Sequence, residues 1–278
     1  MSALTLTLRA LPPHSVDLSP LIPDRLAGLS KAAIETIALG SRGLQVVDLF
    51  AVSGDDAQQM IIRNSSDRLT GIGSGMKQGA ITVEGDCGAY LGLGMRGGQI
   101  AVTGNAGPFA GSGMRSGGLE IRGNAGDFLG AALPGDKQGM RGGIIIVHGN
   151  AGDRAADQMR RGLILIAGDA GAYCGSRMLA GTILVSGHVG TMPGFALKRG
   201  TLLLVRQPRQ LPATFQDSGE HALLFLTLLE RELRRESDRF ARFLPLEHRV
   251  RRYCGDLANG GTGEVLVMVK RPPSPLDR

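Results

Sequence analysis

A short glycine motif that recurs along the middle of the chain constrains the fold more than any other feature. It reads Gly-Asp-Cys-Gly at 85–88 and returns in related forms at 104–107, 123–126, 149–152, 168–171 and 187–190. The steps between these motifs are 19, 19, 26, 19 and 19 residues. A methionine ladder and a glycine ladder keep the same phase: Met76, Met95, Met114, Met140, Met159, Met178 and Leu197, and Gly79, Gly98, Gly117, Gly143, Gly162, Gly181 and Gly200. Repetition at a fixed period indicates a repeat architecture in which each unit packs on the next.

Each repeat also contains a short run of β-forming residues, such as Ile81-Thr-Val83, Ile100-Ala-Val102 and Ile183-Leu-Val185. Alternation within these triplets places their outer residues on one face of a strand. The glycines on either side leave no room for a helix, so each repeat is a coil of short strands and turns. Stacked coils pair their strands in parallel, and parallel crossovers are nearly always right-handed. The sequence therefore predicts an all-β chain, a right-handed parallel β-helix of about seven coils, roughly 33 Å long at ~4.8 Å per coil.

Equivalent residues of successive coils should stack as ladders inside the β-helix. An aliphatic ladder is expected at Ile81, Ile100, Leu119, Ile145, Ile164, Ile183 and Leu202. An aromatic ladder is expected inside as well, formed by Tyr90, Phe109 and Phe128, broken by Arg154 and resumed by Tyr173.

The corners of the coils account for the 43 glycines of the chain. A corner needs a positive φ or a close backbone approach, and glycine supplies both at little cost. Gly104 and Gly123 are expected at such corners, with positive φ. The 26-residue step locates an insertion around Ala131–Lys137, which must loop out of its coil.

The repeat divides the chain into three regions: an N-terminal cap at 1–43, the β-helix at 44–205, and a C-terminal helix and strand extension at 206–278. In the cap we expect a strand at Leu4–Leu8 and a short helix near Leu29–Leu39. A weaker coil is expected upstream of the clear repeats, through Ile61-Ile62 and from Leu44 to Val52.

The C-terminal region begins with Asp217-Ser-Gly-Glu220, which resembles a helix capping box. It predicts an amphipathic helix that runs to about Phe243 and ends before Pro245. The last strand is expected at Glu264–Val269.

The middle residue of each strand triplet faces outward and changes character along the rod. It reads Thr82, Ala101, Glu120, Ile146, Leu165, Leu184 and Leu203. Four aliphatic side chains in a row would leave a patch of a few hundred Å² that proteins usually cover. Either the C-terminal helix or a partner covers it; the helix is the favoured choice, with its arginine-rich face outward.

A row of basic residues at equivalent repeat positions, the basic ladder, is the strongest candidate for a binding site in the sequence. Lysine or arginine follows most ladder methionines, at Lys77, Arg96, Arg115, Arg141, Arg160 and Lys198, with Arg161 and Arg199 beside it and Leu179 interrupting it. The candidate binding residues are Arg96, Arg115, Arg141, Arg160, Lys198 and Arg199. Two interpretations remain open. The ladder is a solvated corner paired with nearby carbonyls and carboxylates, or it binds an anion or an acidic partner surface, because repeated like charges repel one another.

Motifs for catalysis, metals and cofactors are missing from the sequence. Gly92-Leu-Gly-Met-Arg-Gly97 matches G-x-G-x-x-G, but another coil follows it instead of the long helix that a dinucleotide site needs. The three cysteines form no CxxC pair. We therefore expect no catalytic residue, no metal and no cofactor in this chain. With no apolar run of ~20 residues and no signal peptide, we expect a cytoplasmic protein away from membranes. The net charge of +6 permits anionic partners.

The repeat resembles a known family. Its pattern, Gly-Gly-x-Ile-x-Val-x-Gly-Asn-Ala-Gly closed by Gly-x-x-Met-Arg-x-Gly, is similar to the C subunit of formylmethanofuran dehydrogenase and, more distantly, to the C-terminal β-helix of the glutamate synthase large subunit. The likeness covers roughly residues 44–205. The tail, with Tyr253-Cys-Gly-Asp256 before Gly260-Gly-Thr-Gly-Glu264, fits the first of these two branches. Within it, the arginine-rich composition most resembles the C subunit of the bacterial formyltransferase/hydrolase complex.

This resemblance implies a non-catalytic structural subunit. The family assembly moves a formyl group from formyl-tetrahydromethanopterin to a methanofuran-type carrier and hydrolyses it to formate. The implied partners are the amidohydrolase-like A, the degenerate B and the formyltransferase D subunits, with no nucleic acid. The carrier of the family has a glutamate-rich tail, which makes the basic ladder a candidate contact.

Other functions stay open at this stage. The chain could be the C subunit of a molybdenum or tungsten formylmethanofuran dehydrogenase, which the cofactor of its B partner would reveal. It could also be a stand-alone anion-binding β-helix or a conformational-coupling domain. Salt-dependent binding by a monomer would favour the anion-binding alternative.

Overall fold

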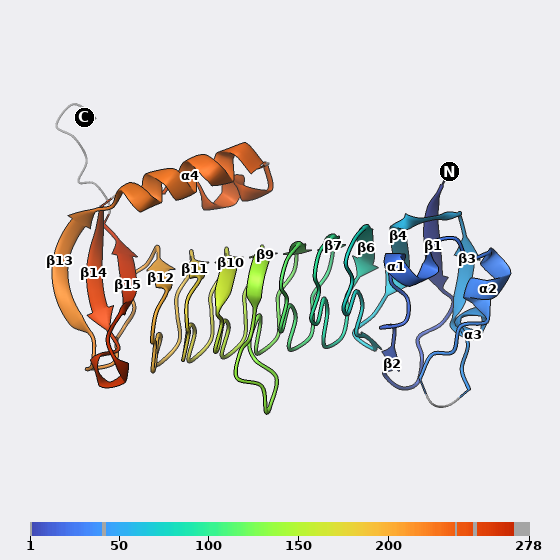
Figure 1. Cartoon of the computed structure of the whole chain (residues 1–278), viewed down its shortest axis with the longest axis horizontal. Helices are drawn as coiled ribbons and strands as arrows, with labels where there is room; N and C mark the ends of the chain where they lie inside the picture. Colours follow the sequence, from blue (N-terminus) through green and yellow to red (C-terminus); the bar gives the residue numbers. More distant parts are fainter. Residues whose placement is uncertain (1, 41–42, 237, 247–248, 270–278) are drawn as a thin grey trace.

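The computed structural model describes residues 2–40, 43–236, 238–246 and 249–269, and these residues form a rod (Figure 1). The strands are β1 (Ala3–Leu8), β2 (Val16–Asp17), β3 (Phe50–Ser53), β4 (Asp56–Ser65), β5 (Leu69–Thr70), β6 (Ala80–Gly85), β7 (Gln99–Val102), β8 (Gly118–Ile121), β9 (Arg141–Val147), β10 (Arg161–Ile166), β11 (Thr182–Val185), β12 (Thr201–Leu204), β13 (Gln216–Ala222), β14 (Arg249–Gly255) and β15 (Gly263–Met268). The helices are α1 (Pro23–Leu26), α2 (Lys31–Glu35), α3 (Val46–Leu49) and α4 (Leu224–Glu236), with 3-10 helices η1 (Asp238–Phe243) and η2 (Leu257–Asn259).

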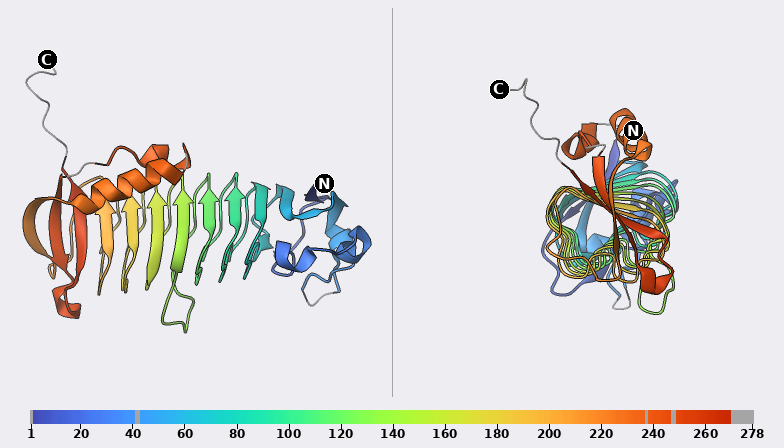
Figure 2. Two further views of the ribbon diagram at one scale, coloured as in Figure 1. Left: turned by 45° about the horizontal axis from the view of Figure 1, so that its top comes forward. Right: turned by 90° about the vertical axis from the view of Figure 1, so that its left-hand side faces the viewer.

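Thirteen strands form one sheet in the order β13-β14-β15-β12-β11-β10-β9-β8-β7-β6-β4-β1-β3. Strands β6 to β12 are parallel, and equivalent repeat positions face each other, so that Ile81 pairs with Ile100 and Ile164 with Ile183. Viewed nearly along the rod, the coils overlie one another (Figure 2). The all-β parallel β-helix predicted from the repeat is confirmed.

The core of the rod is the pair of ladders that the repeat identified. Every member of the aliphatic ladder from Ile81 to Leu202 is at most 1% exposed, and the methionine ladder is fully buried. Burying one such side chain contributes about 1.5–3 kcal/mol. The aligned ladders therefore contribute a large part of the apolar core that stabilises the coils.

The glycine ladder from Gly79 to Gly200 lies at or just before the start of each strand from β6 to β12, with φ between 79° and 108°. A Cβ atom on Gly98 would lie 2.6 Å from the carbonyl oxygen of Gly79. The expectation of positive φ at Gly104 and Gly123 is wrong, since neither has one. A Cβ atom on Gly104 would instead lie 2.3 Å from Asp86 Oδ1, so close stacking is what requires glycine there.

The aromatic ladder lies on the outside of the rod, which corrects the prediction of an internal one. Tyr90 is 40% exposed, whereas the next residue, Leu91, is buried. The positive φ of Tyr90, +66°, turns its side chain outward, and Phe109 and Phe128 share this conformation. Arg154 continues this ladder, because its guanidinium carbon lies 4.7 Å from the centre of the Tyr173 ring.

The N-terminal cap closes one end of the rod. Strand β1 pairs in parallel with β4 and antiparallel with β3. The stretch from Leu44 to Val52, expected as a weak coil, instead contains α3 and the start of β3. The strand that pairs in parallel with β6 on the side of the cap is β4.

At the other end, α4 and η1 lie along the strands from β9 to β12 (Figure 1). Ile146, Leu165, Leu184 and Leu203 form one buried cluster with Leu226, Leu233, Phe240 and Phe243. The prediction that the C-terminal helix covers the outward aliphatic ladder is confirmed. The predicted capping box is wrong: Asp217–Glu220 lie in β13, which pairs antiparallel with β14, and α4 begins only at Leu224.

The insertion leaves the coil between β8 and β9, as predicted, and projects as a loop (Figure 1). Residues 134–137 are exposed. The two ends of the insertion meet where the main-chain amide of Met140 donates a hydrogen bond to the carbonyl oxygen of Gly130 at 2.8 Å. The coil therefore closes beneath the loop.

Candidate functional site

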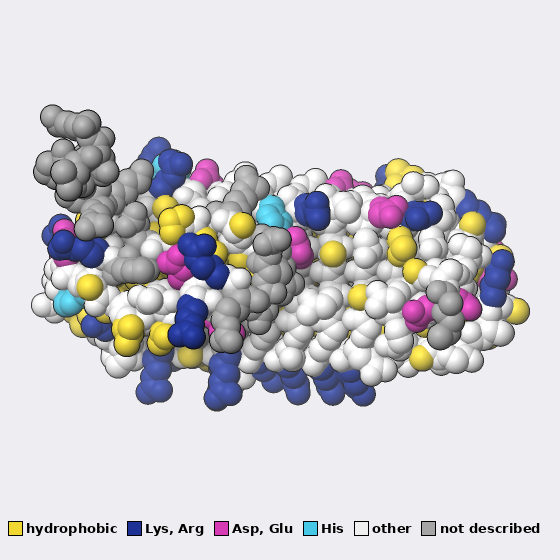
Figure 3. Space-filling view, turned by 90° about the horizontal axis from the view of Figure 1, so that it is seen from above, with side chains coloured by type: hydrophobic (Ala, Val, Ile, Leu, Met, Phe, Trp, Pro, Cys, Tyr) yellow, Lys and Arg dark blue, Asp and Glu magenta, His cyan; other side chains and the backbone are white. Residues whose placement is uncertain are grey.

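The basic ladder lies at the corner that precedes each strand. From Arg96 onward, each member donates its main-chain amide to the carbonyl oxygen of the ladder methionine one coil earlier, whereas the amide of Lys77 donates to Asp24 Oδ2 at 2.8 Å. The distances are 2.7 Å for Arg96, 2.7 Å for Arg115, 2.6 Å for Arg141, 2.8 Å for Arg160 and 3.0 Å for Lys198. This backbone register brings the candidate residues onto one edge of the rod, as the spacing predicted. In the view from above, lysine and arginine side chains project in a row along one edge (Figure 3).

The ladder side chains are exposed and lack ion-pair partners within the described residues. Arg96, Arg115, Arg141, Arg160, Lys198 and Arg199 all belong to the exposed class, and no ion pair involves any of them. Carboxylates of this chain therefore do not neutralise the row in the described part of the structure. Binding of a ligand by the row stays a prediction.

A shallow hollow lies on the surface where Leu179 interrupts the basic ladder. It has a volume of about 450 Å³ and is lined by Arg160, Arg161, Leu179, Ala180, Lys198 and Arg199. Leu179 and Ala180 are shorter than the arginines of the coils on both sides, so four cationic side chains surround the gap. Electrostatic attraction for a carboxylate or phosphate group is concentrated at this point of the row.

A polar ladder stabilises the corner after each strand, and the sequence reasoning missed it. The side-chain Oδ1 of Asp86, Asn105, Asn124, Asn150 and Asp169 each accepts the main-chain amide one coil later, at 2.7–2.8 Å. The signal was visible as the Asp or Asn at the second position of every glycine motif but the last, where His188 stands. These side chains satisfy backbone donors, so their role is structural.

The coils contain a buried carboxylate, that of Asp157. Asp157 is 3% exposed and accepts hydrogen bonds from Ser176 Oγ at 2.8 Å and from Arg177 Nε at 2.9 Å. Hydrogen bonding to Asp157 raises the pKa of Arg177 above its usual value. The carboxylate is thus neutralised and held in place by its neighbours on the next coil.

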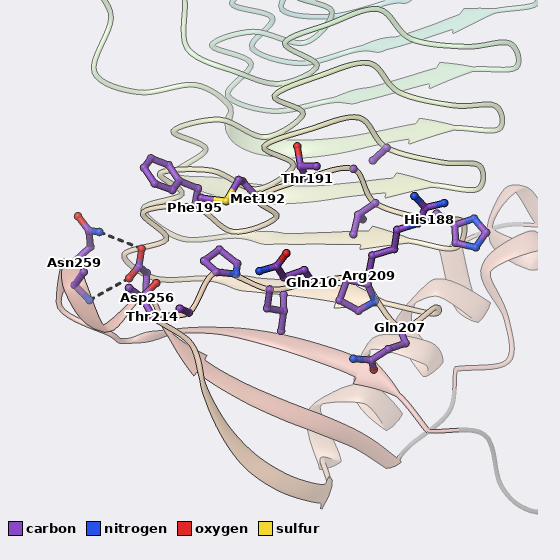
Figure 4. Close-up of a pocket in the computed structure, with 18 of the residues that line it drawn as sticks. His188, Thr191, Met192, Phe195, Gln207, Arg209, Gln210, Thr214, Asp256 and Asn259 are labelled. Atoms are coloured by element: carbon purple, nitrogen blue, oxygen red, sulfur yellow. Dashed lines mark hydrogen bonds between the residues drawn. The ribbon is translucent and has the colours of Figure 1, made fainter.

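A pocket with a volume of about 1170 Å³ lies where the last coils meet the segment after β12 (Figure 4). Its lining includes His188, Phe195, Arg209, Thr214 and Asp256. Asp256 is 3% exposed and accepts hydrogen bonds from the amide of Ala196 and the side chain of Asn259. That carboxylate ties the C-terminal extension to the coil and is not free to bind a ligand.

Two of the cysteine thiols, those of Cys87 and Cys174, are poor nucleophiles. Burial raises the pKa of Cys87 and of Cys174 from an ordinary 9.0 to about 12, with Asp86 adding to the effect at Cys87. A thiol becomes a nucleophile only as the thiolate, so these two side chains serve packing.

The remaining motif, the G-x-G-x-x-G stretch, forms a coil corner. Gly92 and Gly94 have positive φ there, and the short strand β7 follows. Among the described residues, no cluster of three His, Cys, Asp or Glu side chains could hold a metal, and no helix is long and apolar enough to cross a membrane.

Comparison with known proteins places the chain in a family, although no protein-family model matches it. The curated C subunit of the formyltransferase/hydrolase complex Fhc of Methylorubrum extorquens is 44% identical over 89 residues, a match that spans 31% of this chain and only 34% of that relative. A chain in the X-ray structure of the formyltransferase/hydrolase complex FhcABCD from the same organism, in complex with methylofuran, is 42% identical with a TM-score of 0.89. That match covers 96% of this chain and 100% of the other. The chain belongs to the family of the C subunit of the formyltransferase/hydrolase complex.

Proposed function

We propose that this chain is the non-catalytic C subunit of a formyltransferase/hydrolase complex. The complex converts formyl-tetrahydromethanopterin to formate through a formylated methanofuran-type carrier, and the chemistry belongs to other subunits. The observation that carries this proposal is the end-to-end match, at 42% identity and a TM-score of 0.89, to a chain of such a complex. Its partners are the amidohydrolase-like A, the degenerate B and the formyltransferase D subunits, in the cytoplasm.

A structural role is supported by what the reactive side chains of this chain do. The carboxylates of Asp157 and Asp256 are buried and occupied by hydrogen bonds within the fold. The thiols of Cys87 and Cys174 are protonated at physiological pH because burial raises their pKa to about 12. These groups hold coils together, and a side chain engaged in this way is poorly placed to attack or protonate a substrate.

The basic ladder is proposed as a contact for the carrier of the complex. The related complex was crystallised with methylofuran. A glutamate-rich tail is a flexible polyanion, and guanidinium groups pair with carboxylates in many geometries. A row of cations at ~4.8 Å intervals holds such a tail loosely without fixing one register. The hollow beside Leu179, with four cationic side chains around it, is the point of strongest attraction.

The test is reconstitution. The chain is co-expressed with the A, B and D subunits of a formyltransferase/hydrolase complex, and formate release from formyl-tetrahydromethanopterin is measured for the complex and for the chain alone. We expect co-purification and activity of the complex, with no turnover by the isolated chain. Formyl hydrolysis by the chain alone, lost on a point mutation within it, would contradict the structural role.

A further inference from the structure

Helix α4 begins with a run of almost entirely apolar residues. From Leu223 to Leu229, Thr227 is the single polar residue. The inner side is buried in the cluster that contains Leu226, Leu165 and Leu184. A helix that is apolar on every side is normally covered on every side, whereas one on a protein surface has a polar outer face.

Within the described residues, several side chains on the outer side of α4 are exposed. Leu224 is 73% exposed, Phe225 39% and Leu228 55%. These are three of the eight large hydrophobic side chains that are exposed in the described part of the chain. Leu224 and Leu228 lie four residues apart, so they form one stripe with Phe225 beside it. Hydrophobic side chains are visible toward the C-terminal end of the face that α4 occupies (Figure 3).

One helical turn beyond Leu228, the stripe continues with a charged residue, Arg231. Arg231 is exposed, and no described residue forms an ion pair with it. Arg234, by contrast, is paired with Glu230 at 2.6 Å. A surface that complements the stripe is therefore apolar opposite Leu224 and Leu228 and acidic opposite Arg231.

We infer that the outer face of α4 docks into an apolar groove of another subunit of the complex, with a carboxylate on the groove rim facing Arg231. The inference rests on the proposed function and adds to it the surface by which this chain is held. Recognition is of the helix-in-groove type, in which anchors recur at i, i+3, i+4 and i+7, and Leu224, Leu228 and Arg231 stand at i, i+4 and i+7.

The size of the exposed apolar stripe formed by Leu224, Phe225 and Leu228 favours a different subunit over a second copy of this chain as the partner. Three partly exposed side chains offer on the order of 300 Å², well below the ~800 Å² per partner of a stable interface. Two copies joined through this patch alone would therefore not form a stable dimer. The same patch is sufficient as a hot spot within a wider contact, where a few buried anchors provide most of the affinity.

The experiment compares two double variants in the full chain. Leu224→Glu with Leu228→Glu alters the proposed anchors, and glutamate near the start of a helix does not disfavour it. Leu11→Glu with Leu29→Glu is the matched control, because these leucines are 57% and 44% exposed in the cap at the far end of the rod. Each isolated chain is melted, and its affinity for the co-expressed A, B and D subunits is measured by titration.

We expect the α4 variant to keep the Tm of the wild type and to bind the other subunits at least tenfold more weakly, while the control binds as the wild type does. If the glutamates lower the Tm, the pair Leu224→Gln and Leu228→Gln replaces them in the same titration, and at least a tenfold loss is again expected. Unchanged affinity of a folded α4 variant overturns the inference and leaves the proposed function standing. A wild-type dimer that becomes monomeric in the variant overturns it in favour of a second copy. Failure of the wild-type chain to bind any of the subunits overturns the proposed function as well.

Discussion

Nε of Arg177 donates a hydrogen bond to Oδ1 of Asp157 on the preceding coil at 2.9 Å, and this carboxylate is 3% exposed. Replacing Asp157 by alanine leaves the Ser176 hydroxyl without its buried acceptor and removes the partner of Arg177. Loss of a buried charged partner typically costs about 1–3 kcal/mol. We expect Asp157→Ala to lower the Tm by several degrees, measured by circular dichroism. Asp136→Ala, in the exposed loop, is the control and should leave the Tm unchanged.

Glycines of this chain are required for two separable reasons, close stacking in the coils and a positive φ. Gly104→Val and Gly123→Val should abolish soluble expression, because a Cβ atom would lie 2.3 Å from Asp86 Oδ1 and 2.5 Å from Asn105 Oδ1, respectively. Gly135 has a positive φ of 89° but nothing within 4 Å of its added Cβ. Gly135→Ala should therefore cost only the backbone strain of about 1–2 kcal/mol. Normal melting of a Gly104→Val chain would show that the coils are less tightly stacked.

Deleting Ala132–Lys137 should leave the rod intact. The deletion shortens the 26-residue step to 20, and the coil already closes beneath the loop through Met140 and Gly130. We expect the Tm of the isolated chain to stay within a few degrees of the wild type. We also expect the deletion to weaken assembly with the other subunits, on the hypothesis that the loop contacts one of them. Assembly at wild-type strength would remove that hypothesis.

Cys87 and Cys174 should resist alkylation in the folded chain. Their pKa of about 12 keeps them protonated at pH 8, so iodoacetamide should modify them only after unfolding, as mass spectrometry would detect. The folded-state pKa lies above the ordinary 9.0, so the associated stabilisation is fully present below pH 9 and is lost as the pH rises toward 12. Rapid labelling of both thiols in native buffer would mean that the coils open readily.

The basic ladder should act collectively. Exposed ion pairs contribute only about 0.2–1 kcal/mol each, so a single substitution should have little effect. Replacing Arg96, Arg115 and Arg141 together by glutamine should weaken carrier binding by the complex and reduce the dependence of that binding on salt. The measurement is complex activity at low carrier concentration across a salt series. Full activity of an assembled triple variant would mean that the row is only a solvated corner.

Sequence periodicity predicted the rod because the residues that carry it, such as Ile81 and Met95, are constrained in every coil. It could not place Tyr90, since whether a side chain at a corner points inward depends on the sign of φ, and an aromatic residue at +66° has no sequence signature. Asp217–Glu220 was misread for a related reason. A capping box is a local pattern, and pairing of β13 with β14 overrides it through contacts more than 30 residues away.

For the basic ladder, repetition was sufficient to place the residues on one edge, because register fixes the position of Arg96 relative to Arg115. The hollow beside Leu179 was not predictable, since it depends on how far the arginines on both sides extend past a shorter side chain. The exposed side of α4 was not predictable, since Leu224, Leu226 and Leu228 are alike in sequence and only packing on the coils decides which of them is buried.

The loop between β8 and β9 shows how a chain of this kind can change in length. Every ladder requires its members to keep one phase, so a residue added within a strand would turn the side chains that follow it in that strand to the wrong face. The residues of this insertion leave at a corner and return to the same place, and the phase of the following coils is preserved. Relatives of this protein should therefore differ in length by whole coils or by corner loops, and each added coil would move apart whatever is bound at the two ends by ~4.8 Å.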